Sequence, residues 1–253
     1  MSALAIGAMT FVCVYSGALL GMGLRNVLPA HHLTDASKDV VKLGIGLIAT
    51  TAALVLGLLI ASAKTAFDTQ NTEVRQAAAS VLLLDRTLAH YGPETKETRD
   101  LIKRLIAYRL ALTWPEAGAP AETLDATETT APVEDVEARI RDLSPPNDSH
   151  RWLQSRALQL ISDLEQTRWL LFGGAGNTIP VPFLAVLVFW VAVIFLSFGL
   201  YAPPNGTVVV ALLVAALSIS AAIYLIVELD HPFEGLMKIS GAPLRYTLAH
   251  LGQ

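Results

Sequence analysis

The sequence is poor in charged residues. Only 16% of its 253 residues are Asp, Glu, Lys or Arg, while 53% are hydrophobic, against roughly 25% charged and about 45–50% apolar residues in an ordinary soluble domain. This deficit indicates a chain that lies largely in lipid. The 18 Lys and Arg are outnumbered by 22 Asp and Glu, so no positive excess is available to neutralise a nucleic-acid backbone, and we expect no nucleic-acid partner.

Cysteine and the common catalytic motifs are also scarce. Cys13 is the one cysteine, which excludes an intrachain disulfide and a thiolate metal site. The sequence has no phosphate-binding Gly-x-x-x-x-Gly-Lys-Ser/Thr loop, no His-Glu-x-x-His and no Gly-x-Ser-x-Gly. The adjacent His31 and His32 would point in different directions on a helix, so joint metal ligation is not expected. We therefore expect no catalytic residue, no metal ion and no cofactor.

Four stretches without charge stand out: residues 3–24, 43–63, 181–201 and 207–227. About 22 helical residues at about 1.5 Å each cross a hydrocarbon core of about 30 Å. Each stretch is therefore predicted to span a bilayer. A secretory signal peptide is the alternative for the first stretch, but such a peptide starts with basic residues, whereas Arg25 here follows the apolar run.

The four spans organise the chain. Residues 1–63 hold the first two spans, 64–179 form a long insert, 180–227 form a hairpin of two spans, and 228–253 form a tail. The hairpin turns at Pro203-Pro204-Asn205-Gly206, where proline presets φ and Asn-Gly tolerates positive φ. Both termini then lie on the side of the insert. Five Lys and Arg beside the spans on that side, against three in the loop between the first two spans, favour a cytoplasmic location for the insert and termini, although Arg25 argues the other way.

The insert is predicted to be mostly helical. Apolar residues recur at steps of three and four, typical of helices that pack on other helices, at Val74, Ala77, Val81, Leu84, Leu88 and Tyr91. A second helix is expected over residues 94–113. Residues 116–148 read as an acidic loop with a short turn near 133–143, and a third helix runs from 147 or 149 to 172, ended by glycines at 173–176. The apolar stripes are covered either within one subunit or between subunits.

Small and hydroxyl-bearing residues mark the first two spans. Gly17-x-x-x-Gly21 and Gly57-x-x-x-Ala61 have the spacing that lets helix backbones approach closely, so we expect them to pack helices. Thr50 and Thr51 either bond back to their own helix or face a water-filled passage. A passage along the second span would be lined by Thr50, Thr51, Leu54, Gly57 and Leu58, with an apolar constriction at Leu54 or Leu58.

A polar cluster follows the fourth span and comprises Glu228, Asp230, His231 and Glu234. Its oxygen ligands suit a hard cation, but no twelve-residue calcium loop can be drawn. Ion pairing with Lys64 and Arg75 is the favoured interpretation.

Several stretches resemble the bacterial bestrophin-like membrane family of unknown function. They are residues 55–64 with 67–70, 82–86 with 88–94, and the closing motif at 229–236 with 240–245. The family's closing motif more usually has arginine where His231 stands. By likeness to bestrophins, the resemblance implies an oligomeric anion channel with four spans per subunit, cytoplasmic termini and a helical cytoplasmic domain.

We therefore expect an all-α membrane protein with four transmembrane helices per subunit and a helical cytoplasmic insert between the second and third. The predicted function is a homo-oligomeric channel for inorganic ions, a tetramer or pentamer in the bacterial inner membrane. The choice of anions as the permeating ions is based on the family likeness alone. The insert has 13 basic and 17 acidic residues, so it has no excess of positive charge that would select anions. The alternative is a membrane scaffold or sensor without a pore, which recruits a partner through the apolar seam at 74–91.

Overall fold

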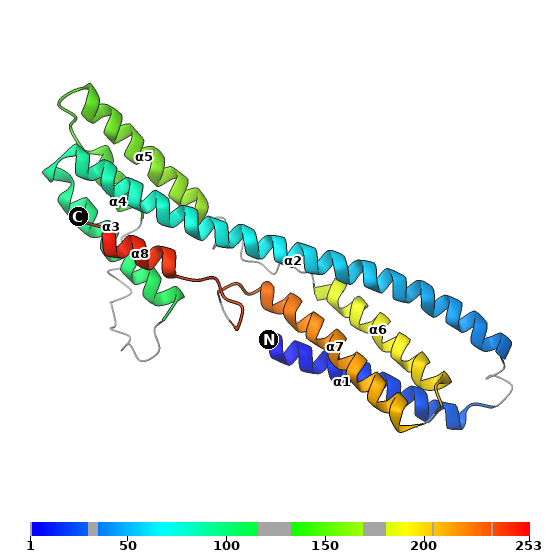
Figure 1. Ribbon diagram of the computed structural model, residues 1–253. Helices are drawn as coiled ribbons and strands as arrows, with labels where there is room; N and C mark the ends of the chain where they lie inside the picture. Colours follow the sequence, from blue (N-terminus) through cyan, green and yellow to red (C-terminus); the bar gives the residue numbers. More distant parts are fainter. Residues whose placement is uncertain (1, 30–34, 116–132, 169–180, 204, 234) are drawn as a thin grey trace. The chain divides into compact units, whose positions relative to one another are not determined.

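The computed structural model describes residues 2–29, 35–115, 133–168, 181–203, 205–233 and 235–253. The regular structure in these ranges is helical (Figure 1), in the order α1 (Ala3–Val27), α2 (Asp35–Tyr91), η2 (Pro93–Thr95), α3 (Lys96–Thr113), α4 (Val133–Arg141), α5 (Asp148–Arg168), α6 (Val181–Tyr201), α7 (Gly206–Leu229) and α8 (Ala242–His250). The histidine pair at 31–32, the first part of the predicted acidic loop and the glycines at 173–176 lie outside the described residues.

Four of these helices are long and apolar enough to cross a bilayer, namely α1, α2, α6 and α7. The prediction of an all-α membrane protein with four spans is confirmed. Helix α6 begins and ends where the third span was expected, at residues 181 and 201.

Helix α2 is much longer than the span that the sequence delimits. Its 57 residues run without a break through Lys64, where we expected the second span to end before a separate helix. Neither proline nor glycine, the residues that interrupt helices, occurs between residues 64 and 74. Charge at Lys64 limits the apolar segment, but it does not end the helix.

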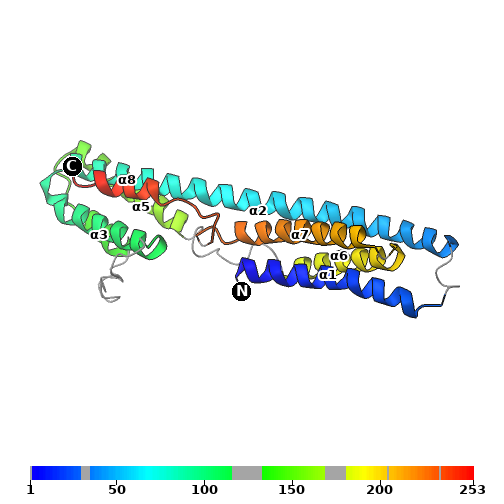
Figure 2. The ribbon, with the colours of Figure 1, turned by 60° about the horizontal axis from the view of Figure 1, so that its bottom comes forward.

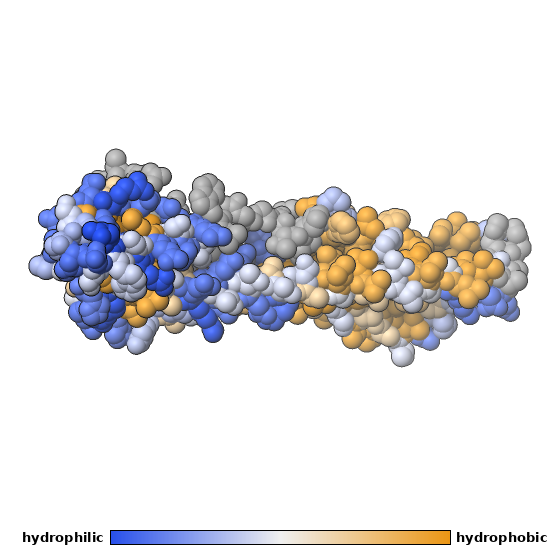
Figure 3. All heavy atoms as spheres, turned by 90° about the horizontal axis from the view of Figure 1, so that it is seen from above, coloured by the Kyte–Doolittle hydropathy of each residue, from blue (hydrophilic) through white to orange (hydrophobic). Residues whose placement is uncertain are grey.

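The chain divides into two compact units, each described here by itself. The membrane unit comprises Met1–Phe67 and Asn177–Met237, and the polar unit comprises Asp68–Gly176 and Lys238–Gln253. Figure 3 shows hydrophobic residues gathered over the surface of the membrane unit and hydrophilic residues over the polar unit.

Within the membrane unit, α1 packs against α6 and α7 (Figures 1 and 2) through glycines. A Cβ added to Gly21 would overlap the carbonyl oxygen of Leu196, and a Cβ on Gly17 would lie 2.9 Å from the carbonyl oxygen of Ala192. A Cβ on Gly199 of α6 would likewise overlap the backbone of α1. Backbones this close require residues without side chains, so the predicted packing role of Gly17 and Gly21 is confirmed.

The hairpin between α6 and α7 is fixed by a helix cap. The side-chain oxygen of Asn205 accepts a hydrogen bond from the backbone N–H of Val208 at 2.9 Å. Asn205 has a φ of −128°, so the turn does not use the positive φ that Asn-Gly would tolerate. On the same side, Arg25 donates to the carbonyl oxygen of Ala202 at 2.6 Å and ties the end of α1 to the end of α6.

The polar unit has its own hydrophobic core. It contains Val81, Leu84, Leu88, Leu101, Ile102, Val136, Ile140, Ala157, Leu160, Ile161 and Leu251. These residues come from α2, α3, α4 and α5 and from the residue after α8. The apolar seam of α2 is therefore covered within one subunit, which settles the choice left open by the sequence.

The polar unit contains one short helix near a predicted turn and differs from expectation elsewhere. Residues 133–141 form α4, which lies where the sequence suggested a short turn within the acidic loop, and its Val136 and Ile140 lie one turn apart and are only 3% and 0% exposed. The tail contains α8, which we did not predict. The second predicted helix was expected as one helix over residues 94–113. It begins as the short helix η2 and continues as α3, after Gly92 turns the chain with a φ of 146°.

Candidate ion pathway

The apolar segment of α2 is the least buried of the four spans. Only 11% of its apolar window lies inside the subunit, against 28%, 33% and 28% for α1, α6 and α7. Four leucines on one face keep between 69% and 78% of their surface exposed: Leu43, Leu47, Leu54 and Leu58. The opposite face contributes Ala52, Leu59 and Ala63 to the core. Lipid or a further subunit must cover the exposed face.

Two threonines lie within this segment. The hydroxyls of Thr50 and Thr51 both donate to the carbonyl oxygen of Leu47, each at 2.9 Å. Thr50 is exposed and Thr51 is half-buried. A hydroxyl that donates to its own helix still offers its oxygen as an acceptor, so this bonding is compatible with contact to water or ions.

The glycines of this segment do not pack against the rest of the subunit. Nothing lies within 4 Å of a Cβ added to Gly44, Gly46 or Gly57, and Ala61 is exposed. The expectation that Gly57 and Ala61 pack helices is therefore wrong within one subunit. The exposed face of α2 offers room at its glycines and a hydroxyl at Thr50.

The exposed faces of the other spans are also largely apolar. They carry large apolar side chains, including Leu4, Met9, Val12, Leu19 and Leu20 on α1, Phe183 and Phe189 on α6, and Val210, Val214 and Leu217 on α7. Side chains of this kind suit acyl chains. Exposed hydroxyl residues or open glycines also occur on α1 and α7, at Ser16, Gly23, Gly206 and Ser218, so what distinguishes α2 from its neighbours is how little of its apolar segment the subunit covers.

The predicted polar cluster after the fourth span is organised around Glu228. Its carboxylate is only 4% exposed and accepts hydrogen bonds from the backbone N–H groups of Leu236 and Met237, the second at 3.3 Å. Gly235 has a φ of 76°, and a Cβ there would overlap the Glu228 carboxylate. The motif therefore forms a turn that is held by a buried acid.

The other members of the cluster do not complete a metal site. Nδ1 of His231 lies 2.9 Å from the carbonyl oxygen of Val227, within its own helix end. Asp230 also takes part in a polar or electrostatic interaction, and Glu234 lies outside the described residues. Among the described residues, no three His, Cys, Asp or Glu side chains gather as metal ligands would.

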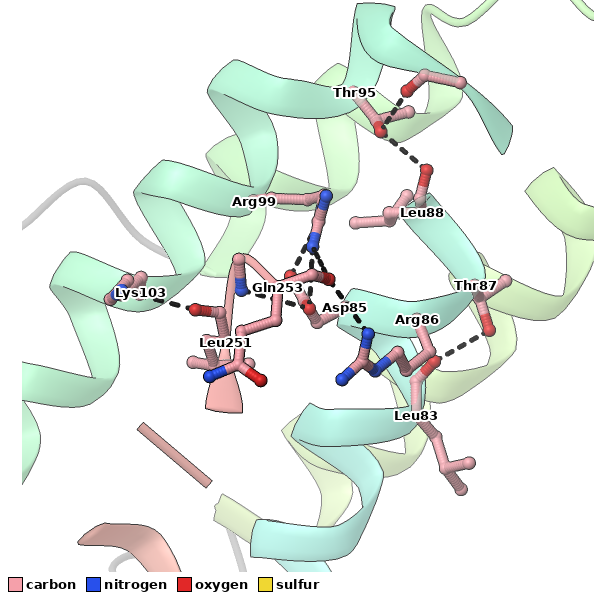
Figure 4. Close-up of polar contacts among 12 residues, drawn as sticks. Leu83, Asp85, Arg86, Thr87, Leu88, Thr95, Arg99, Lys103, Leu251 and Gln253 are labelled. Atoms are coloured by element: carbon pink, nitrogen blue, oxygen red, sulfur yellow. Dashed lines mark hydrogen bonds and ion pairs between the residues drawn. The ribbon is translucent and has the colours of Figure 1, made fainter. Parts of the chain in front are cut away.

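A second buried acid, Asp85, organises the polar unit (Figure 4). Asp85 is fully buried and binds Arg99 through two hydrogen bonds, Nε to Oδ1 at 2.7 Å and Nη2 to Oδ2 at 3.0 Å. Its Oδ2 also accepts from the backbone N–H of Gly252 at 3.3 Å. These side-chain hydrogen bonds raise the pKa of Arg99 above its ordinary value, although burial opposes the shift.

Cationic side chains hold the residues that follow α8. Arg86 donates to the carbonyl oxygen of Gln253 at 2.9 Å, and Lys103 donates to that of Leu251 at 3.2 Å. Arg99 reaches Gln253 as well, at 3.4 Å. Side chains from both α2 and α3 therefore form hydrogen bonds to the residues that follow α8 (Figure 4).

Trp114 holds the residues that lead into α8. Its indole Nε1 donates to the carbonyl oxygen of Ile239 at 2.7 Å in a buried environment. A Cβ on Gly241 would lie 2.9 Å from the indole ring. Further along α8, the hydroxyl of Thr247 donates to the carbonyl oxygen of Ala78 on α2 at 3.0 Å.

Sequence reasoning missed these roles, although a signal was present. Asp85 directly follows Leu84 on the seam of α2, and an acid beside buried leucines needs a cation. The candidate partner, Arg99, comes just after the Gly92-Pro93 turn that reverses the chain.

A family model described as the Bestrophin-like domain matches residues 12–244 of the chain. No curated protein and no solved structure matches the chain. The matched range includes the span of α2, both buried acids and the Gly235 turn.

Proposed function

The chain belongs to the bestrophin-like family, and from this premise we propose that it forms a homo-oligomeric ion channel in which α2 lines the pathway. The observation that carries the proposal is the uncovered apolar face of α2. In a ring of subunits, this face supplies the wall of a central passage through Thr50, Thr51, Leu54, Gly57 and Leu58. A tetramer or pentamer would leave a space on the axis.

The low burial of the apolar segment of α2 supports a role for this face in a ring of subunits. The carbonyl-bonded hydroxyl of Thr50 retains an acceptor for water, and the glycines leave the backbone open to approach. On the axis of a ring these positions would widen a hydrated passage between rings of leucine.

The exposed leucines supply the gate in this proposal. Rings of Leu54 and Leu58 would form an apolar constriction that passes ions when it is wet and blocks them when it is dry. No charged residue occurs between residues 43 and 63, so this segment gives no electrostatic selectivity. We propose anions as the permeating ions because of the family, with the protein in the bacterial inner membrane and the polar unit in the cytoplasm.

A scaffold without a pore is less well supported. That hypothesis relied on the apolar seam at residues 74–91 as a surface for a partner. Val81, Leu84 and Leu88 of this seam are instead buried in the core of their own subunit.

The proposal is tested by reconstituting the purified protein in liposomes and measuring chloride and potassium flux in parallel. We expect Leu54→Ala to raise the flux by widening the constriction and Thr50→Ala to lower it by removing a polar contact. Leu20→Ala is the matched control, because Leu20 is an exposed leucine on α1, and we expect its flux to equal that of the wild type.

The outcome also depends on the number of subunits, which mass photometry of the reconstituted protein measures. A ring of four or more subunits with the expected flux pattern supports the channel. A monomer or dimer without flux, or equal effects of Leu54→Ala and Leu20→Ala, would overturn it and favour the scaffold.

A further inference from the structure

The connection after α7 folds back onto the end of that helix (Figure 1). The Glu228 carboxylate, in the last turn of α7, accepts from the backbone N–H groups of Leu236 and Met237. Gly235 makes this return possible because its φ of 76° suits glycine and because a side chain there would collide with the carboxylate. Leu236 and Met237 are therefore held at the level where α7 ends.

The side chains of these two residues are uncovered. Leu236 is 85% exposed, the largest fraction among the large apolar side chains that the structure describes, and Met237 is 41% exposed. Their backbone N–H groups, in contrast, are satisfied by Glu228. The turn thus hides its polar backbone and presents two apolar side chains.

The position of the turn along α7 identifies what covers these side chains. Glu228 is the first charged residue after the uncharged run that begins at Thr207, so it marks the level at which α7 leaves the hydrocarbon. An exposed leucine at this level meets the boundary between headgroups and acyl chains. Lys238, the next residue along the chain, is exposed, and a lysine beside apolar residues is typical of segments that anchor at this boundary.

We propose that Leu236 and Met237 insert into the bilayer interface and that Lys238 contacts the phosphates of the headgroups. The Glu228–Gly235 turn is then a lipid-anchoring element that fixes the depth of the α7–α8 connection in the membrane. The occupant of this apolar surface is the bilayer itself. This proposal does not depend on the existence of a pore.

The test uses a single-cysteine variant, Leu236→Cys, in a Cys13→Ser background, labelled with the environment-sensitive fluorophore NBD and reconstituted in liposomes. Spin-labelled phospholipids then quench the fluorophore, with the spin label either near the headgroup or deep in the acyl chain. Ser155→Cys is the control in water, because Ser155 is exposed on α5 of the polar unit. Leu20→Cys, exposed on the spanning helix α1, is the control within the bilayer.

We expect Leu236→Cys to give blue-shifted emission and to be quenched more strongly by the shallow spin label than by the deep one. Leu20→Cys should show the opposite preference, and Ser155→Cys should show neither the blue shift nor the quenching. Emission at Leu236→Cys that matches Ser155→Cys would overturn the proposal. So would blue-shifted emission that neither spin label quenches, because protein would then cover this side chain. Met237→Cys repeats the measurement at the neighbouring residue, so that the result does not rest on one variant.

Discussion

Asp85 and Arg99 face each other across the turn between α2 and α3 and are joined by two hydrogen bonds of 2.7 and 3.0 Å. The side chain of Asp85 is fully buried, and the side chain of Arg99 is 17% exposed. The same carboxylate accepts a hydrogen bond from the backbone N–H of Gly252. One buried acid therefore holds α3 and the residues after α8 against α2.

Replacing Asp85 by alanine should strongly destabilise the polar unit. Loss of one partner from a buried ion pair costs about 3–5 kcal/mol, because the remaining charge is left without its counter-ion. We expect a lower thermal unfolding temperature in detergent, measured by differential scanning fluorimetry. Asp163→Asn, at an exposed carboxylate on α5, is the control and should change little. Equal effects of the two variants would contradict the role of the pair.

The contribution of the Asp85–Arg99 pair to the free energy of unfolding should stay constant as the pH rises from about 7 to about 10. The hydrogen bonds to the Asp85 side chain raise the pKa of Arg99 above its ordinary value. A group with a raised folded pKa contributes its stability fully below the unfolded pKa and loses it only as the pH rises towards the folded pKa. The difference in unfolding temperature between the wild type and Asp85→Ala should therefore stay constant from about pH 7 to about pH 10. A difference that shrinks across this range would show that another group carries the effect.

Removing the indole donor of Trp114 should loosen the entrance to α8. In Trp114→Phe the buried carbonyl oxygen of Ile239 loses its hydrogen bond, at a cost of about 1–3 kcal/mol. Hydrogen exchange measured by mass spectrometry should increase across residues 239–250. Trp152→Phe is the matched control, because Trp152 is 66% exposed, and it should leave the exchange unchanged. Unchanged exchange in Trp114→Phe would mean that the bond does not hold α8.

The two groups of glycines in the membrane unit should respond differently to alanine. Gly21→Ala places a Cβ on the carbonyl oxygen of Leu196 and forces α1 away from α6, at a cost of about 1–3 kcal/mol. Gly57→Ala meets no atom of its own subunit and should leave subunit stability nearly unchanged. Thermal unfolding in a detergent that keeps the subunit monomeric compares the two. The prediction fails if Gly57→Ala is as destabilising as Gly21→Ala.

Substitutions at Glu228 should separate its acceptor oxygen from its charge. Both backbone hydrogen bonds reach the same oxygen, Oε1, and glutamine also offers one carbonyl oxygen. Glu228→Ala removes the acceptor of two part-buried hydrogen bonds, each of which contributes about 0.5–1.5 kcal/mol net, whereas Glu228→Gln should lose less. Amide hydrogen exchange at Leu236 and Met237 reports this directly and should rise most in the alanine variant. Equal exchange in both variants would indicate that charge, and not geometry, holds the turn.

Sequence periodicity was a reliable guide to the helices but a weaker one to their ends. The third span was predicted near residues 181–201, and its end at Tyr201 was found as expected, because the hairpin turn delimits it. The continuity of α2 through Lys64 was missed, since hydropathy marks where a bilayer ends and says nothing about where a helix ends. Helix α4 was anticipated only as a short turn near 133–143, because nine residues give few repeats of the apolar pattern.

The amino-acid sequence by itself determined the four uncharged spans, the helical insert and the family, because these depend on local composition and short-range periodicity. Tertiary structure alone decided which faces of the helices are covered. Gly21 and Gly57 look alike as small residues in apolar runs, yet one touches a neighbouring backbone and the other touches nothing. Asp85 and Arg99 meet for the same reason, since the contact depends on how two helices fold back on each other and not on either helix alone.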